Sequence, residues 1–306
     1  MKKPWIYLIF CASLLFCSSA QAKDRMEEIV SLCVGEDVLD YIREKIEKTP
    51  VEESPFPHFI IEDILPETLY EAGQSFWPHP NCFYAKGFPH HGPVHRLHVC
   101  TSLGSIEHSS LTPEQKMFWR TFGEVVVNHY MKPLIAQKLL NYIHYKFPGA
   151  TPEQLNALKK SFEFYPFHYD SLLIDDANYF IDPHVDGVKT FAQCLLYFPE
   201  DNDHQDLGTK FFRGPPFRKG HYNSCVAALK LEKHVRYKRN TLVVFLQSPT
   251  SWHSADTSPY PDTHYLRKMF LMTLRTSPEA VNQIYNLQET LTDWYYQDFN
   301  QVNPRE

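Results

Sequence analysis

The stretch from residue 161 to residue 276 alternates between short apolar runs and turn residues, and this alternation constrains the fold of the 306-residue chain most strongly. Each run is rich in β-branched and aromatic residues, which favour strands. Several short strands at this spacing predict a sandwich or a barrel. The predicted strands are Phe162–Tyr169, Asn178–Ile181, Thr190–Phe198, Lys210–Arg213, Val226–Leu231, Thr241–Leu246 and Lys268–Arg275.

The rest of the chain is expected to be mainly helical. Apolar residues at helical spacing mark residues 25–48 as an amphipathic helix. A long helix over residues 113–145 contains Pro133, which should kink or break it because proline lacks an amide hydrogen. Residues 79–110 are rich in Pro, Gly and His without a clear period, which predicts a surface loop. Two further predicted helices and one short strand cover residues 66–77, 278–299 and 59–61.

Together these elements predict an α+β fold. A helical N-terminal half would pack against a β-rich C-terminal half, and a C-terminal helix would close the chain. The proline-rich segment Thr49–Pro57 is typical of a linker. We therefore divide the chain into residues 1–22, an N-terminal helix and linker over 23–57, and one domain over 58–306 with its β-core at about 161–276.

The first 22 residues resemble a secretory signal peptide. Two lysines near the start precede the apolar run Trp5–Cys17, and the small residues of Ser18–Ala22 follow it. The run is too short to span a bilayer, so no stable membrane span is expected. We expect cleavage after Ala22 and export to a periplasm, a secretory lumen or the exterior. A lipoprotein modified at Cys17 is the alternative, although a large residue precedes that cysteine.

Cysteine spacing and net charge argue against two kinds of site. The chain has no CxxC pair, so a zinc site built on thiolates is disfavoured. The net charge is −6 and no block of lysine and arginine stands out, which argues against binding to nucleic acid. One or two disulfides could form in an oxidising compartment, with their pairing open, and Cys194 is expected to be a buried free thiol. The cysteines beyond Ala22 are Cys33, Cys82, Cys100, Cys194 and Cys225.

The strongest functional signal is a His-x-Asp pattern followed by a distant histidine. Residues two apart in an extended segment point to the same face. Only His184 and Asp186 lie between two predicted strands, and His253 would add a second imidazole. Two imidazoles and one carboxylate leave open positions on a metal, as in the facial triad of non-haem Fe(II) oxygenases. The pattern also occurs at His168/Asp170 and at His204/Asp206.

From Ser161 to Thr276 the chain resembles the 2-oxoglutarate- and Fe(II)-dependent oxygenases of the prolyl-hydroxylase type. The order of the motifs carries the resemblance: the His-x-Asp pair, a glycine-led strand at Gly208, the Trp252-His253 pair and a final strand opened by Arg267. Thr209 stands where the family more commonly has a second glycine. The resemblance implies a double-stranded β-helix, also called a jelly roll.

The resemblance also implies the chemistry. His184, Asp186 and His253 would bind Fe(II) at the catalytic centre, with 2-oxoglutarate as cosubstrate and O2 as oxidant. The reaction would hydroxylate a C–H bond of the substrate. A polypeptide or glycan outside the cytosol is the favoured substrate class, because export suits it better than a small metabolite. The alternatives are a non-catalytic metal-binding jelly roll and a metal-dependent hydrolase, although no GxSxG nucleophile motif is present.

The cosubstrate's distal carboxylate requires a buried cation. Arg267 is the candidate, because a guanidinium binds a carboxylate through two parallel hydrogen bonds. Lys268 is the alternative, since only one of two neighbouring strand residues can face inward. Tyr179 could donate a hydrogen bond to the cosubstrate or serve as a core residue.

Overall fold

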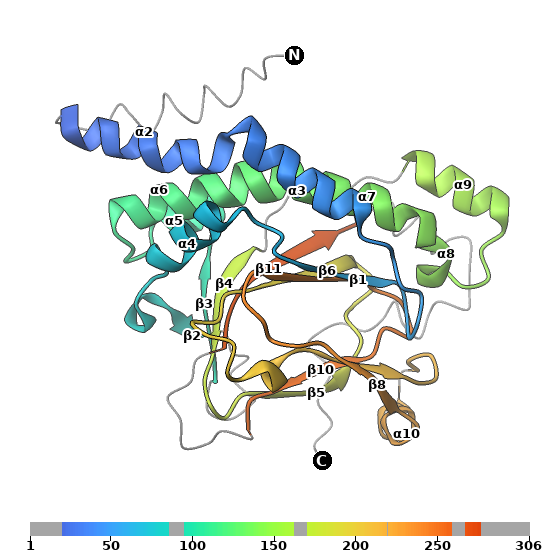
Figure 1. Cartoon of the computed structure of the whole chain (residues 1–306). Coiled ribbons are helices and arrows are strands. Elements are labelled where there is room, and N and C mark those ends of the chain that lie inside the picture. Colours follow the sequence, from blue (N-terminus) through green and yellow to red (C-terminus); the bar gives the residue numbers. More distant parts are fainter. Residues whose placement is uncertain (1–19, 86–94, 162–169, 219, 259–266, 277–306) are drawn as a thin grey trace.

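The structure is a computed structural model that describes residues 20–85, 95–161, 170–218, 220–258 and 267–276 (Figure 1). These residues contain eleven strands, arranged in two antiparallel sheets. The strands are β1 His58–Glu62, β2 Tyr84–Ala85, β3 Arg96–Cys100, β4 Ser171–Asp175, β5 Phe180–His184, β6 Thr190–Tyr197, β7 Lys210–Arg213, β8 Lys230–His234, β9 Thr241–Leu246, β10 His253–Asp256 and β11 Arg267–Arg275.

Eight of the strands pair as expected for a jelly-roll core. The larger sheet has the order β1-β9-β6-β11-β4-β3-β2, and the smaller has the order β5-β10-β7-β8. From β4 onward the first strand pairs with the last, the second with the next to last, and so on inward, always antiparallel. Two facing sheets connected in this way are consistent with the predicted jelly roll.

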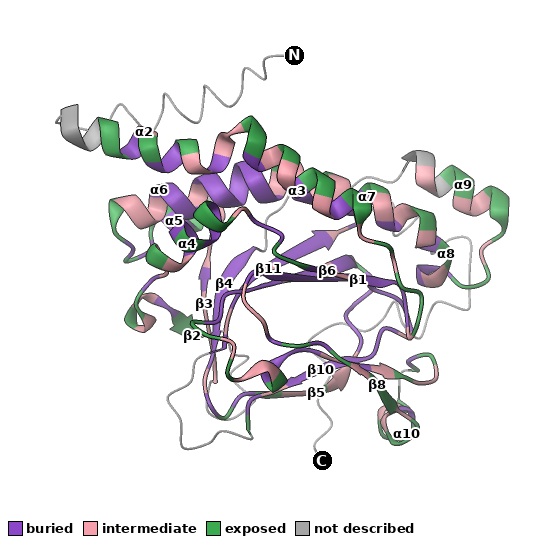
Figure 2. Ribbon diagram, viewed as in Figure 1, coloured by how far each residue is buried: buried purple, intermediate pink, exposed green. Residues whose placement is uncertain are grey.

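Helices cover the outer face of the larger sheet, opposite the smaller sheet (Figure 1). The sides of these helices that face the sheet are buried, and the opposite sides are exposed (Figure 2). No described helix is long and apolar enough to cross a membrane. The helices are α2 Ala20–Val34, α3 Glu36–Lys48, α4 Glu67–Ser75, α5 Leu103–Glu107, α6 Pro113–Thr121, the π-helical segment Phe122–Met131, α7 Lys132–Leu139, α8 Ile143–Lys146, α9 Pro152–Ser161 and α10 Tyr222–Ala227.

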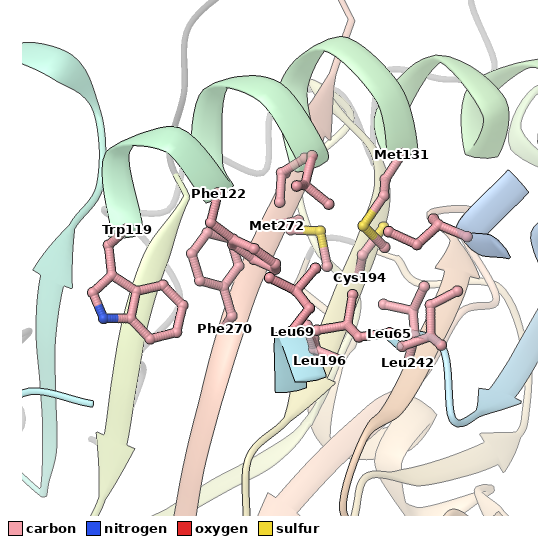
Figure 3. Close-up of a cluster of buried hydrophobic side chains, with 14 of the residues drawn as sticks. Leu65, Leu69, Trp119, Phe122, Met131, Cys194, Leu196, Leu242, Phe270 and Met272 are labelled. Carbon is pink, nitrogen blue, oxygen red and sulfur yellow. The ribbon is translucent and has the colours of Figure 1, made fainter. Parts of the chain in front are cut away.

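The main core lies between these helices and the larger sheet. Trp119 and Phe122 descend from the helical layer onto Phe270 of β11 (Figure 3). Cys194 of β6 lies in the same cluster as a buried free thiol, as its apolar surroundings predicted. The other four cysteines of the described residues are also free. A second cluster fills the space between the two sheets and includes Tyr197.

Two predicted helices are interrupted. The single helix expected over 25–48 is divided into α2 and α3 at Gly35, whose ψ of 135° is not helical. The helix expected over 113–145 becomes π-helical over Phe122–Met131, immediately before Pro133. Proline cannot donate the amide hydrogen bond of a regular α-helix, so the hydrogen-bond pattern changes there.

The predicted loop over residues 79–110 was wrong in part, because it contains β2, β3 and α5. Strand β3 alternates Arg96, His98 and Cys100 with two apolar residues that face the helices. This alternation is too short to stand out among the surrounding Pro, Gly and His residues. Of the strands before β4, β1 matches the strand predicted at residues 59–61, whereas β2 and β3 lie where a loop was expected.

Other predicted boundaries shift by a few residues. The run Val226–Leu231 is not one strand, because α10 ends at Ala227 and β8 begins at Lys230. Strand β4 was not predicted, and β5 begins two residues later than expected. The predicted strand Phe162–Tyr169 and the predicted helix 278–299 lie outside the described residues.

Candidate functional site

The three candidate metal ligands come together at one end of the smaller sheet. His184 ends β5 and His253 begins β10, and the two are direct partners in the antiparallel pairing of these strands. Their ring centroids lie 4.2 Å apart. Asp186 follows His184 by two residues and turns its carboxylate back towards both rings. Within the described ranges these three side chains are the group of His, Cys, Asp and Glu that could hold a metal ion.

The distances between the ligand atoms suit a shared metal better than hydrogen bonds. His184 Nε2 lies 3.6 Å from Asp186 Oδ1, and His253 Nε2 lies 4.0 Å from Asp186 Oδ2. Both distances exceed those of a hydrogen bond. The potential ligand atoms of the three residues all lie within 4.8 Å of one another. The geometry is therefore suitable for one metal ion bound by all three side chains.

Backbone carbonyls determine the tautomer of each histidine. Nδ1 of His184 lies 2.8 Å from the carbonyl oxygen of Asp182, and Nδ1 of His253 lies 2.9 Å from that of Ser251. A carbonyl only accepts, so in a neutral ring Nδ1 carries the proton and Nε2 keeps its lone pair. Both Nε2 atoms therefore present lone pairs beside the Asp186 carboxylate, as metal-ligating histidines do.

Burial keeps one of these rings neutral. His253 is 8% exposed. Removal from water lowers its pKa to about 4, and the neighbouring His184 contributes to the decrease. The aromatic ring of Phe245 contacts His253 edge to face, with centroids 4.6 Å apart. A neutral, water-excluded imidazole is ready to bind a metal at neutral pH without first losing a proton.

Two glutamines hold Asp186. Gln193 donates a hydrogen bond of 2.9 Å from Nε2 to Asp186 Oδ2. Gln247 accepts a hydrogen bond of 3.3 Å from the Asp186 amide, and its side-chain oxygen also accepts from Ser251. Because Ser251 precedes the Trp252-His253 pair, Gln247 connects the segment bearing the carboxylate to the segment bearing His253.

A buried lysine supports the same two segments. Lys146 at the end of α8 is fully buried and donates from Nζ to the carbonyl oxygens of Val188, Thr190 and Gln247, at 2.9, 2.7 and 3.4 Å. Burial lowers the pKa of Lys146 well below its ordinary value, and the Asp186 charge opposes that decrease. The helical layer thus contributes directly to the position of the carboxylate. Sequence reasoning did not identify Lys146 or either glutamine.

Arg267 and Lys268 face opposite sides of β11. Arg267 is 1% exposed and points between the sheets, where it donates 2.6 Å to the Leu207 carbonyl and 3.4 Å to Thr209 Oγ1. Lys268 instead forms an ion pair with the exposed Glu200. Of the two candidate cations, Arg267 therefore is the one inside the jelly roll.

Arg267 belongs to a row of charges that crosses three strands. Arg96 of β3, Asp175 of β4 and Arg267 of β11 are direct cross-strand partners. Arg96 binds the Asp175 carboxylate with Nε and Nη2, at 2.5 and 2.8 Å, and Arg267 binds it with Nη1 at 2.8 Å. Two guanidinium groups thus share one carboxylate, which leaves an excess positive charge in a buried place.

Tyr179 lies against this row of charges and within electrostatic reach of Asp186. The Arg96 guanidinium covers its ring at 4.1 Å from the centroid. Burial raises the pKa of Tyr179 to about 12, while the charges of Arg267 and Asp186 also act on the phenol. Tyr179 is therefore a neutral hydroxyl at physiological pH, placed within electrostatic reach of both groups. Arg96 and Asp175 were missed because β3 and β4 were not predicted.

The other His-x-Asp pairs do not form comparable groups in the described residues. Asp206 lies in the 3-10 turn Gln205–Leu207, two residues after His204. His168 lies outside the described residues, whereas Asp170 is buried and forms an ion pair of 2.8 Å with Lys132. Within the described residues, the His-x-Asp pair that forms a candidate metal site is therefore His184/Asp186, the pair predicted from its position between two strands.

The comparisons with known proteins found only distant similarity. No family model matches the chain, and no curated protein matches it. A prolyl hydroxylase from Trichoplax adhaerens, in complex with a hypoxia inducible factor peptide, aligns over 87% of this chain and 97% of its own, with 10% identity and a TM-score of 0.42. A prolyl-4-hydroxylase from Pseudomonas putida aligns over 78% and 99%, with 12% identity and a TM-score of 0.40. The α-ketoglutarate-dependent epimerase SnoN of nogalamycin biosynthesis aligns over 78% and 82%, with 11% identity and a TM-score of 0.42.

The chain is thus similar, at low identity, to prolyl hydroxylases and to a non-haem α-ketoglutarate-dependent epimerase. At these identities its function has to be inferred from the site itself.

Proposed function

We propose that this protein is an Fe(II)- and 2-oxoglutarate-dependent oxygenase that hydroxylates a C–H bond of its substrate. The observation that carries the proposal is the group of His184, Asp186 and His253, whose ligand atoms surround one position. Two imidazoles and one carboxylate on one side of an ion are the donor set of the non-haem Fe(II) oxygenases.

The residues present fit the metal. Each Nδ1 is engaged by a backbone carbonyl, so that both Nε2 atoms are available as ligands. In a site of this kind the protein binds the metal on one side and leaves the other side open to cosubstrate and O2. When bound, iron and 2-oxoglutarate together supply the oxidising power that inserts oxygen into a C–H bond. His184, Asp186 and His253 would position that chemistry, and the ring of Phe245 packs against His253.

The row of charges fits the distal carboxylate of 2-oxoglutarate. Arg96 and Arg267 together carry one more charge than Asp175 neutralises, and a buried surplus charge is unfavourable without a counterion. The hydrogen bond from Arg267 Nη2 to Thr209 Oγ1 is long, at 3.4 Å. Nη2 can therefore exchange it for a hydrogen bond to the cosubstrate carboxylate with little loss of free energy. Tyr179 is a second donor for the cosubstrate, because its hydroxyl keeps its proton at neutral pH.

An extracytoplasmic polypeptide or glycan is the substrate class within this proposal. The signal-peptide pattern of residues 1–22 supports export. The described buried side chains of α2 begin at Met26, which lies beyond the expected cleavage point after Ala22. N-terminal sequencing of the protein exported from its native host should start at Lys23. A protein kept in the cytosol with Met1 in place would contradict this part of the proposal.

The reaction is tested by the fate of the cosubstrate. The purified protein is loaded with Fe(II) and 2-oxoglutarate without oxygen, then exposed to O2, and succinate is measured. We expect succinate to form in the wild type and to be absent in Asp186→Ala. Incubation with peptide and glycan pools, followed by mass spectrometry for the gain of one oxygen atom, identifies the substrate class. Metal binding without succinate would favour the non-catalytic module.

A further inference from the structure

We propose that Gln193 is a positioning residue that fixes the orientation of the Asp186 carboxylate for the metal. Gln193 lies on β6, seven residues after Asp186, and donates from Nε2 to Asp186 Oδ2 at 2.9 Å. The inference rests on the metal site of the proposed function and adds a residue that does not itself bind the metal.

The position of Gln193 follows from the alternation of β6. Its strand neighbour Cys194 faces the helices, whereas Gln193 faces the space between the sheets with Leu195 lying two residues further along the same strand face. The direct cross-strand partner of Gln193 on β11 is Thr273. Gln193 thus lies between Asp186 on one side and Thr273 on the other.

The partners of Gln193 determine which way its amide points. An ionised carboxylate only accepts hydrogen bonds, so the amide nitrogen has to face Asp186. The amide oxygen then faces Thr273, whose hydroxyl donates to it at 2.9 Å. Both ends of the amide are therefore satisfied in one orientation only.

The chain of contacts extends to a buried ion pair. The Thr273 amide donates to Asp170 Oδ1 at 3.3 Å, and Lys132 of α7 lies 2.8 Å from the same carboxylate. Asp170 is fully buried, and the Lys132 side chain is 13% exposed. The helical layer thereby holds Thr273, Thr273 orients Gln193, and Gln193 orients Asp186. Outer hydrogen-bond partners of this kind commonly tune metal affinity.

The test measures metal affinity without turnover. Co(II) alone is titrated into metal-free wild type and into Gln193→Met, which keeps the length of the side chain but cannot donate. We expect the dissociation constant of Gln193→Met to rise about 10- to 100-fold, with an altered Co(II) absorption spectrum. Thr273→Val leaves Gln193 free to turn and should produce a smaller increase.

A matched control separates positioning from general stability. Gln74 also donates two side-chain hydrogen bonds, to Tyr70 and Pro199, on the helical side of the molecule. Gln74→Met should leave the Co(II) affinity unchanged, whatever it does to the thermal midpoint. If the wild type binds Co(II) stoichiometrically and Gln193→Met binds it equally well, this inference is wrong and the metal site stands. If the wild type does not bind Co(II), the metal site and the inference both fail.

Discussion

Asp186 is the residue on which the candidate metal site depends most. It is the only acidic ligand of the group, it is buried, and Gln193 and Gln247 position it. A buried carboxylate beside two imidazoles is costly to keep unless a cation binds there.

We expect Asp186→Ala to abolish stoichiometric Fe(II) binding and to leave the metal-free fold intact. The decrease in Fe(II) affinity should exceed the roughly 10- to 100-fold decrease that follows the loss of an outer hydrogen-bond partner, because a direct ligand is removed. Asp186→Asn keeps the shape and should lose most of the affinity as well. Anaerobic titration with Fe(II) measures binding, and the thermal midpoint of the metal-free protein checks the fold. Full iron binding by Asp186→Ala would refute the assignment.

The second prediction at this scale concerns Arg267. Arg267→Ala should lower the affinity for 2-oxoglutarate by about 30-fold or more, because losing a charged partner of a buried carboxylate costs about 2–5 kcal/mol. The fold should survive, since Asp175 keeps its two hydrogen bonds to Arg96. Arg267→Lys should give an intermediate affinity, because it keeps the charge and loses the second donor.

Lys268→Ala is the matched control for that experiment. Lys268 pairs with the exposed Glu200 on the other face of β11, so its removal should change little. The measurement is 2-oxoglutarate binding to the anaerobic Fe(II) protein. If all of the variants bind like the wild type, the row of charges is not the cosubstrate site.

At the scale of the elements, the start of β7 depends on a close backbone contact. Gly208 lies between Leu207 and Thr209, which are both partners of Arg267. A Cβ atom on Gly208 would lie 1.6 Å from the carbonyl oxygen of Val235, a backbone atom that cannot turn aside. The glycine that leads this strand is therefore required by packing. The following Thr209 is buried, and its hydroxyl lies within hydrogen-bond distance of Tyr197 and Arg267.

Gly208→Ala should lower the free energy of unfolding by about 3 kcal/mol, because the two backbones have to separate. Urea unfolding of the metal-free protein measures the change, and 2-oxoglutarate binding should weaken because the partners of Arg267 move. Gly123→Ala is the control, since a Cβ there meets Thr101 at an ordinary 3.5 Å. Equal stability of the two variants would show that the strands tolerate the displacement.

At the scale of the whole molecule, acid sensitivity of the fold should include a contribution from His58. His58 is fully buried on β1, with Nδ1 2.8 Å from the Phe56 carbonyl and its ring against Phe211. Burial lowers the pKa of His58 below 6.5. The folded state then binds fewer protons than the unfolded state in this pH range. The contribution of neutral His58 to the free energy of unfolding is therefore fully present above about pH 6.5 and is lost as the pH falls through the folded-state pKa.

Replacing His58 by leucine should remove this contribution. We expect the difference between the urea midpoints at pH 7.5 and pH 5 to be smaller in His58→Leu than in the wild type. Other groups that titrate between pH 5 and pH 7.5 are present in both proteins. The comparison of the wild-type difference with the His58→Leu difference therefore isolates the contribution of His58. An unchanged pH dependence would show that His58 does not contribute.

The local patterns of the chain were sufficient for several elements. Strands β6, β9 and β11 follow from runs of β-branched and aromatic residues, which suit a buried sheet wherever the partners lie. The grouping of His184 and Asp186 follows from residues two apart in an extended segment. By contrast, β3 and β4 were missed, because each strand has only five residues. The alternation of β3 is short, and β4 is buried throughout and shows no alternation.

The sequence by itself determined which residue types are available for chemistry and where the long apolar strands lie, since both depend on composition and spacing over a few residues. Only the tertiary structure decided which distant residues meet. His253 reaches His184 because β10 pairs with β5, and Arg96 reaches Arg267 because β3 and β11 both flank β4. Such pairings depend on register between strands far apart in the chain, and register is determined by packing of the whole sheet rather than by any local pattern.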